Sequence, residues 1–165
     1  MQKSAGVLGA TIFVLLLVTI CIWTAVAQAS TGGKLTVTFL DVGQGDAIFI
    51  QSPSGAQMLI DGGKNRAVIR ELSRVMPWFD RSIDVVLGTH PDADHIGGLP
   101  DVLKRYRASL IQQSSVLDPE GADSRAFNEA ITREVEEGAT RLVALRGQVI
   151  DLGGGAYFEI LFPDR

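Results

Sequence analysis

The stretch that decides the fold of this chain is Thr89-His90-Pro91-Asp92-Ala93-Asp94-His95-Ile96-Gly97-Gly98. Six consecutive positions in this stretch, residues 90–95, contain four potential metal ligands: His90, Asp92, Asp94 and His95. The two histidines among them are the only ones in the sequence. They follow an apolar run at residues 83–87 that predicts a buried strand, and α/β sheets commonly place their sites at the C-terminal ends of strands. Imidazoles and carboxylates this close together can converge on one or two metal ions. The pattern therefore predicts a metal site.

Two simpler interpretations of this stretch fit less well. A polar surface loop could use its histidines and aspartates only to cap the next helix, but two of each at this spacing favour metal binding. A calcium-binding loop fits poorly because Ile96 stands where the third loop ligand should be. Gly97 and Gly98 lack side chains and so let neighbouring backbone approach the site closely.

Outward from this stretch, the hydrophobic pattern predicts an α/β layered domain. Helices are predicted at residues 66–75, 100–106 and 124–137, with Ser124 as the N-cap of the last and Gly138 as its stop. A helix is expected to begin soon after His95. Short apolar runs predict strands at residues 35–40, 47–50, 57–60, 83–87, 109–112, 142–145, 149–152 and 157–162. Turn residues at 53–55 predict a hairpin between the second and third of these strands.

Three linked motifs resemble a known family. The run from His90 to His95 is similar to the His-x-His-x-Asp-His signature of the metallo-β-lactamase fold. Together with residues 39–47 (FLDVGQGDA) and 59–63 (LIDGG), it resembles the extracytoplasmic metallohydrolase domain of ComEC-type competence proteins, over about Lys34 to Leu99. The resemblance implies an α/β fold, the four-layer αββα metallo-β-lactamase-like sandwich. Only the first part of that sandwich is expected here, preceded by one N-terminal transmembrane or signal helix.

The resemblance also assigns roles within the metal loop. It implies two divalent metal ions, zinc or manganese, with His90 as a ligand of one site and Asp94 and His95 as ligands of the other. His90 and Asp94 are then the catalytic residues. Asp92 stands where the signature has its second histidine, and this change to a harder oxygen donor favours manganese over zinc. The alternative is that Asp92 does not bind metal at all.

Three further aspartates fall on the other two motifs. Asp61 belongs to the Asp-Gly-Gly segment, and the resemblance implies that it orients the metal loop through hydrogen bonds. A plain turn is the competing interpretation. Asp41 and Asp46 flank the Gly43-Gln44-Gly45 turn and are expected to shape the pocket rather than to take part in catalysis.

The resemblance favours a metal-dependent hydrolase that uses metal-activated water on an ester bond. The expected substrate is a phosphodiester, with nuclease-like processing of DNA in competence as the specific case. The alternative function is a non-catalytic metal-binding or interaction module with an incomplete site. The net charge of −4 over 165 residues argues against a protein that holds nucleic acid through bulk positive charge. The basic run at residues 104–107 is either a phosphate contact or a solvated helix end.

Other catalytic motifs are missing from the sequence. The Gly43-Gln44-Gly45 turn has no third glycine at the spacing of a dinucleotide-binding loop, and Gly62-Gly63-Lys64 lacks the earlier glycine of a P-loop. There is no Gly-x-Ser-x-Gly segment, and the single cysteine, Cys21, lies in an apolar segment. Serine or thiol nucleophiles therefore have no support.

The metal site is expected to need more ligands than one loop supplies. A two-metal site typically requires about four donors for each ion, and no histidine follows His95. We therefore expect the hydrolase domain, residues 34–165, to lack its C-terminal half. A missing segment or a partner chain would supply the remaining ligands. Alone, residues 34–165 are expected to bind metal weakly, to aggregate or dimerise, and to hydrolyse nothing efficiently.

The N-terminal residues 1–30 form a separate unit. From Ala5 to Ala27 about 23 residues carry no charge, enough for a helix of roughly 34 Å that could cross a bilayer. This length favours a membrane anchor, whereas Ala27-Gln28-Ala29 before Ser30 has the form of a signal-peptidase site. In either case the domain is expected outside the cytoplasm, either anchored to the membrane or secreted into the periplasm or medium.

This topology can be tested with a reporter. Alkaline phosphatase fused after Arg165 should be active, because the only long apolar segment precedes the whole domain. Phosphatase activity of cells carrying the fusion is the measurement. An inactive phosphatase together with an active cytoplasmic reporter at the same position would contradict the prediction.

Overall fold

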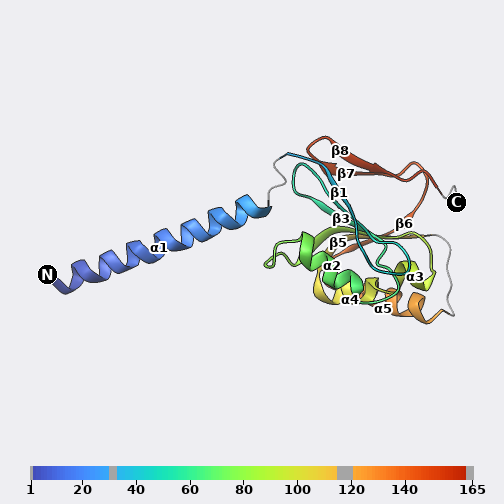
Figure 1. Ribbon diagram of the computed structural model, residues 1–165, viewed down its shortest axis with the longest axis horizontal. Coiled ribbons are helices and arrows are strands. Elements are labelled where there is room, and N and C mark those ends of the chain that lie inside the picture. The colour runs from blue at the N-terminus through green and yellow to red at the C-terminus, as the bar shows by residue number, and fades with distance from the viewer. Residues whose placement is uncertain (1, 30–32, 115–120, 163–165) are drawn as a thin grey trace. The chain divides into compact units, whose positions relative to one another are not determined.

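A long helix, α1 (Gln2–Ala29), forms the first of the two units into which the chain divides, residues 1–30 and 31–165. The computed structural model describes residues 2–29, 33–114 and 121–162 (Figure 1). Along α1 the side chains of Phe13, Leu15, Ile20 and Trp23 are exposed. Within the described part of the chain, no helix reaches the length and hydropathy that a membrane crossing requires. The predicted helix is confirmed, the membrane anchor is not, and the cleavage position at Ser30 lies outside the described residues.

The second unit is built on a six-stranded mixed sheet with the strand order β1-β2-β3-β4-β5-β6. Its strands are β1 (Thr36–Phe39), β2 (Ile48–Gln51), β3 (Gln57–Ile60), β4 (Ser82–Gly88), β5 (Arg107–Ser114) and β6 (Thr140–Ala144). The first three strands pair antiparallel, which confirms the predicted hairpin between β2 and β3. From β3 to β6 all neighbours are parallel. The carboxyl ends of β3, β4, β5 and β6 therefore lie along one edge of the sheet.

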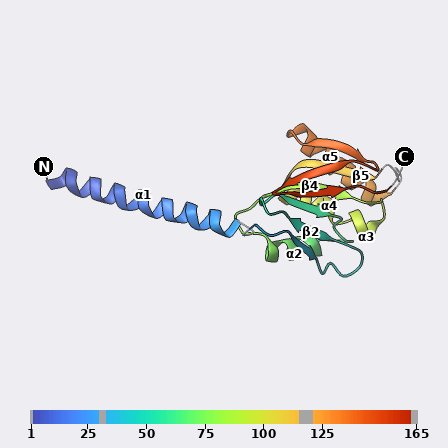
Figure 2. The same ribbon diagram turned by 90° about the horizontal axis from the view of Figure 1, so that it is seen from above.

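Helices cover one face of this sheet and a β-hairpin covers the other. The helices are α2 (Ala67–Val75), α3 (Ala93–Ile96), α4 (Leu99–Arg105) and α5 (Ala122–Glu136), and the hairpin is β7 (Val149–Gly153) with β8 (Ala156–Glu159). Figure 1 shows the helices below the sheet and the hairpin above it, and Figure 2 shows the hairpin lying over the sheet. The described residues thus supply a helical layer and two sheet layers of the expected four-layer sandwich.

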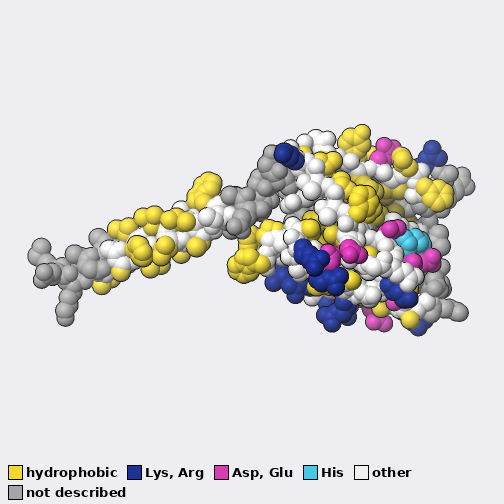
Figure 3. Space-filling model, viewed as in Figure 1, with side chains coloured by type: hydrophobic (Ala, Val, Ile, Leu, Met, Phe, Trp, Pro, Cys, Tyr) yellow, Lys and Arg dark blue, Asp and Glu magenta, His cyan; other side chains and the backbone are white. Residues whose placement is uncertain are grey.

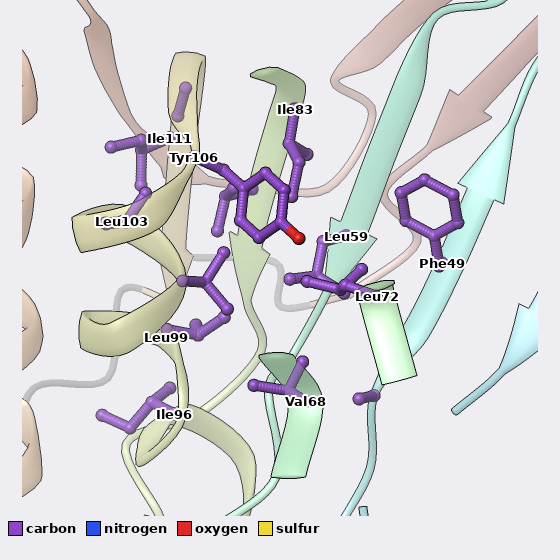
Figure 4. Packing of buried hydrophobic residues seen from close by; sticks show 14 of the residues in the cluster. Phe49, Leu59, Val68, Leu72, Ile83, Ile96, Leu99, Leu103, Tyr106 and Ile111 are labelled. Atoms are coloured by element: carbon purple, nitrogen blue, oxygen red, sulfur yellow. The ribbon is translucent and has the colours of Figure 1, made fainter. Parts of the chain in front are cut away.

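Side chains along β3 point alternately to the two faces of the sheet, and each face has its own hydrophobic cluster. Leu59 has no exposed surface and packs with Leu72 of α2 and Leu99 of α4 in the cluster under the helices (Figure 4). Its neighbours Met58 and Ile60 point the other way and join the hairpin cluster. Full burial of one such side chain stabilises the fold by roughly 1.5–3 kcal/mol. Both faces of β3 and β4 are covered, which explains why these strands read as continuous apolar runs.

The structure corrects one of the predicted helix starts and adds a short helix. The α5 helix begins at Ala122, with Gly121 rather than Ser124 at its N-cap. Ser124 lies three residues before Phe127 on the buried face, so its side chain faces the core instead of capping the helix. The α4 helix begins at Leu99, soon after His95 as predicted, and the short helix α3 (Ala93–Ile96), which was not predicted, precedes it and buries Ile96. Gly138 ends α5 as predicted, with a φ of 109°.

Candidate metal centre

Asp61 lies at the centre of the site, immediately after β3. Its backbone N–H donates to the carbonyl of Leu87 in β4 at 2.8 Å, and the residue is only 3% exposed. Its φ of 58° is the only positive value among the described residues other than glycine. Aspartate tolerates this left-handed conformation better than most side chains, but it still costs of order 1 kcal/mol. The strained backbone therefore occurs at the residue whose carboxylate makes the contacts described next.

The Asp61 carboxylate accepts three hydrogen bonds from the metal loop. Oδ1 accepts the backbone N–H of Thr89 at 2.8 Å, and Oδ2 accepts the Thr89 hydroxyl at 2.6 Å. Oδ2 also contacts Nδ1 of His95 at 2.8 Å. These bonds join Asp61 to the loop, and its role in orienting a metal ligand stays a prediction. Thr89, which the sequence analysis did not single out, belongs to the same network, and its position directly before His90 was the available signal.

This network fixes which nitrogen of each imidazole is free. A carboxylate can only accept, so His95 donates its Nδ1–H to Asp61 and leaves a lone pair on Nε2. The Thr89 hydroxyl uses its single hydrogen on Asp61, so at its 2.9 Å contact with His90 it accepts from Nδ1–H. Both histidines therefore keep Nε2 as an available donor atom for a metal.

The two imidazoles lie against each other. Their ring centroids are 3.7 Å apart with an interplanar angle of 46°. One donor atom each from Asp61, His90 and His95 lies within 4.8 Å of the others. Imidazole nitrogen and carboxylate oxygen are the donor types that zinc takes in proteins, so this set fits a divalent metal. Because both Asp61 oxygens already accept hydrogen bonds, its carboxylate serves better to hold His95 than to bind the ion.

The two aspartates of the loop are placed differently from the histidines. The Asp92 side chain is 70% exposed, and its Oδ2 lies 3.5 Å from Nε2 of His90, beside the position a metal would take. Asp94 is half-buried in α3, and among the described residues its side chain makes no recorded contact with the three-residue cluster. The structure thus brings His90 and His95 together and places Asp92 beside them. The ligand roles of Asp92 and Asp94 stay predictions.

Glycines let two turns pack directly on the loop. A Cβ added to Gly45 would fall 1.6 Å from the carbonyl oxygen of Asp94, and one on Gly98 would fall 2.1 Å from the carbonyl oxygen of Gly62. Real side chains do not reach these distances, so both positions require glycine. Backbone bonds tie the segments further, including Gly62 N–H to the His95 carbonyl at 2.7 Å.

Asp41 and Asp46 flank the turn that touches the loop, but both side chains are exposed. Asp46 contacts the site through its backbone carbonyl, which accepts the Gly63 N–H at 2.9 Å. The backbone of Gly45 packs against the backbone of Asp94. Backbone atoms of this turn therefore make the contacts with the site, and the pocket-shaping role expected for the two carboxylates stays a prediction.

Comparison with known proteins places these features in context. The model of the Metallo-beta-lactamase superfamily matches residues 40–157. The chain is 31% identical over 112 residues to "Ribonuclease Z" of Clostridium kluyveri, covering 67% of this chain and 36% of that protein. It is 26% identical over 146 residues to "ComE operon protein 3" of Bacillus subtilis, covering 78% of this chain and 18% of that protein. The chain thus spans about a third of the first relative and about a fifth of the second.

Among solved structures, the fold is similar to that of "Rm3 metallo-beta-lactamase". The TM-score is 0.50 at 18% sequence identity, over 73% of this chain and 46% of that chain. At this identity the likeness concerns the fold alone.

The hydrogen bond from His95 to Asp61 can be tested by substitution. In Asp61→Asn the amide oxygen must face the Thr89 N–H, so the amide nitrogen faces His95 and donates to Nδ1. The imidazole proton then moves to Nε2, and we expect zinc affinity to fall about 10–100-fold. Competition with a chromophoric chelator measures the affinity, and ¹⁵N NMR of the imidazoles reports the tautomer.

The matched control is Glu129→Gln, which makes the same chemical change on the exposed face of α5. It should leave both readouts unchanged. Equal zinc affinity in Asp61→Asn and the unmodified chain would show that Asp61 does not position a ligand.

Proposed function

The chain belongs to the metallo-beta-lactamase superfamily, and on this basis we propose that it is a metal-dependent hydrolase of phosphodiester bonds. The proposal rests on one observation above the others. Two imidazoles lie in contact with both Nε2 atoms available, and a buried carboxylate and a threonine hydroxyl hold them in that state. Such preorganisation has no structural use on a surface loop, because a loop that only caps a helix needs no fixed imidazole tautomers.

His90 and His95 would hold the metal ion, with Asp92 beside His90 as the nearest further oxygen donor. When bound, a divalent ion supplies Lewis acidity and lowers the pKa of a coordinated water toward roughly 7. Asp61 takes no direct part in this chemistry. It keeps the His95 proton on Nδ1 and, through Thr89, the His90 proton on Nδ1, so that neither histidine presents an N–H to the metal position.

A phosphodiester is the substrate class that we propose. One relative is named "Ribonuclease Z" and the other "ComE operon protein 3", and both are matched over part of their length. Processing of DNA in competence is the specific case. The exposed side of Asp92 leaves the metal position open to solvent and therefore to a large substrate.

Hydrolysis by the chain is directly measurable. With Mn²⁺ or Zn²⁺, and with the segment or partner that completes the site, we expect cleavage of bis-p-nitrophenyl phosphate and of single-stranded DNA. His90→Ala should lower the rate by more than about a hundredfold, since loss of the ion removes several kcal/mol of transition-state stabilisation. Glu129→Ala, remote on α5, is the control and should keep the rate of the unmodified chain.

A metal-loaded chain that cleaves no phosphoester even when the missing segment or partner is supplied would contradict the proposal. It would favour the alternative function, a non-catalytic metal-binding or interaction module. A chain whose activity survives His90→Ala would place the reaction elsewhere.

We propose further that a partner chain or an additional segment completes the site. Among the described residues, the histidines and Asp61 form the only group of three or more potential ligands, and Asp61 is committed to hydrogen bonds. Apolar side chains are also exposed on both outer strands of the sheet and on the hairpin: Val37, Phe39, Leu142, Val143, Val149 and Tyr157. Exposed strand edges of this composition commonly pair with other chains.

Calorimetry tests this second proposal. The full chain in detergent should bind fewer than two zinc or manganese ions per monomer, because its described donors suffice for one weakly held ion. Sedimentation should show self-association through the exposed strands. Tight binding of two ions per monomer by a monomeric, active chain would show that the site is complete without a partner.

We also propose that the domain lies outside the cytoplasm. The support is the uncharged segment from Ala5 to Ala27, which forms most of α1, and the match to "ComE operon protein 3". The phosphatase fusion described above tests this location.

A further inference from the structure

The edge of the sheet opposite the metal centre carries a different surface. Strands β3, β4 and β5 all begin there, and so does β1, because it runs antiparallel to β2 and therefore parallel to β3. The chain enters the domain at this edge, at Lys34 and Leu35 before β1. The seven residues of β4 span about 23 Å, which separates this edge from the metal loop.

An aromatic pair projects from this edge on the turn between α2 and β4. Trp78 is 81% exposed and meets Phe79 edge to face, with ring centroids 5.7 Å apart. Figure 3 shows hydrophobic side chains on this protruding turn, with Lys and Arg side chains gathered beside it. Exposed apolar side chains that gather in one contiguous patch are typical of protein or membrane interaction sites.

The turn is held firmly rather than loosely. The Asp80 N–H donates to the Pro77 carbonyl at 3.0 Å and closes the turn. The Asp80 carboxylate accepts from the backbone N–H and hydroxyl of Ser82 and from Nε2 of Gln57, the last at 2.7 Å. The aromatic pair is therefore fixed in its exposed position by the starts of β3 and β4.

Beside the turn lies a basic hollow of about 330 Å³. Arg81 follows the turn directly and lines the hollow, and its carbonyl accepts the Arg107 N–H at 2.8 Å. Five cationic side chains line it: Arg81, Lys104, Arg105, Arg107 and Arg133. The whole chain has a net charge of −4, so this edge of the sheet is more positive than the rest of the chain.

The two carboxylates that line the hollow are already engaged. Glu134 is buried and accepts the Ala108 N–H at 3.0 Å, and Glu137 forms a close ion pair with Arg107. Lys104 pairs with Asp101 at 3.1 Å. Among the described residues, Arg81, Arg105 and Arg133 form no ion pair, so three guanidinium groups remain available to an anion.

We propose that this edge is a docking surface for a membrane that contains anionic lipids. Trp78 and Phe79 enter the interfacial layer, where aromatic side chains are favoured, and the guanidinium groups bind lipid phosphates. The metal centre at the opposite edge then faces away from the membrane.

Two observations favour a membrane over nucleic acid as the occupant. The aromatic rings sit on a convex turn and contact each other, whereas bases stack on ring faces that line a groove. A nucleic acid strand bound here would also lie about 23 Å from the metal loop.

Fluorescence of Trp78 in the full chain tests the proposal. The sequence has two tryptophans, and Trp23→Phe leaves Trp78 as the only one. With vesicles of phosphatidylcholine and phosphatidylglycerol, its emission should shift to shorter wavelength, and lipids with brominated acyl chains should quench it. Vesicles of phosphatidylcholine alone should produce much less of either effect.

Two variants that each lose two positive charges, one at each edge of the sheet, test the role of the arginines. Arg81→Ser with Arg105→Ser should lower the ratio of docked to undocked domains about thirtyfold, or about fivefold for each cation. Lys64→Ser with Arg66→Ser removes the same charge near the metal edge and should leave quenching unchanged. Thermal unfolding checks that both variants are folded.

Three results would overturn the proposal. The first is a solvent-exposed, unquenched Trp78 with anionic vesicles, and the second is equal quenching with neutral vesicles. The third is loss of single-stranded DNA binding in the Arg81 and Arg105 variant while quenching persists, which would assign the surface to nucleic acid.

Discussion

The hydrogen bonds of the Asp61 carboxylate are the interaction on which the functional site depends. One buried side chain reaches the backbone of Thr89, its hydroxyl and the ring of His95, and so joins the end of β3 to the loop after β4. Without these bonds a buried carboxylate would remain unsatisfied, at a cost of several kcal/mol. The left-handed backbone at Asp61 is tolerated because the same residue links two strands and a helix.

Parallel pairing explains why such a short segment can organise the site. The register sets Ile60 beside Leu87, so the residues that follow both strands emerge next to each other at the same edge. The Asp-Gly-Gly segment after one strand and the histidine loop after the other are far apart in sequence but adjacent in space. Gly98 then allows the backbones of the two segments to approach closely.

Much of this could be predicted from the sequence, because the governing patterns are local. Apolar runs marked β3 and β4, and the spacing of His90 and His95 marked the site. Features that depend on tertiary contacts were not accessible in this way. Ser124 has the side chain of an N-cap but lies on the buried face of α5, and the role of Thr89 depends on a carboxylate that is 28 residues away.

The two edges of the sheet also divide the chemistry of the domain. Glycines, aspartates and histidines gather where the strands end, and arginines with an aromatic turn gather where they begin. Separation by the length of β4 keeps the arginines too far away to compete with a metal for the carboxylates of the loop. A cation cluster beside the histidines would raise the electrostatic cost of binding a divalent ion. The separation therefore suits the two proposed roles, a metal site at one end of an acidic domain and a docking surface for anionic lipids at the other.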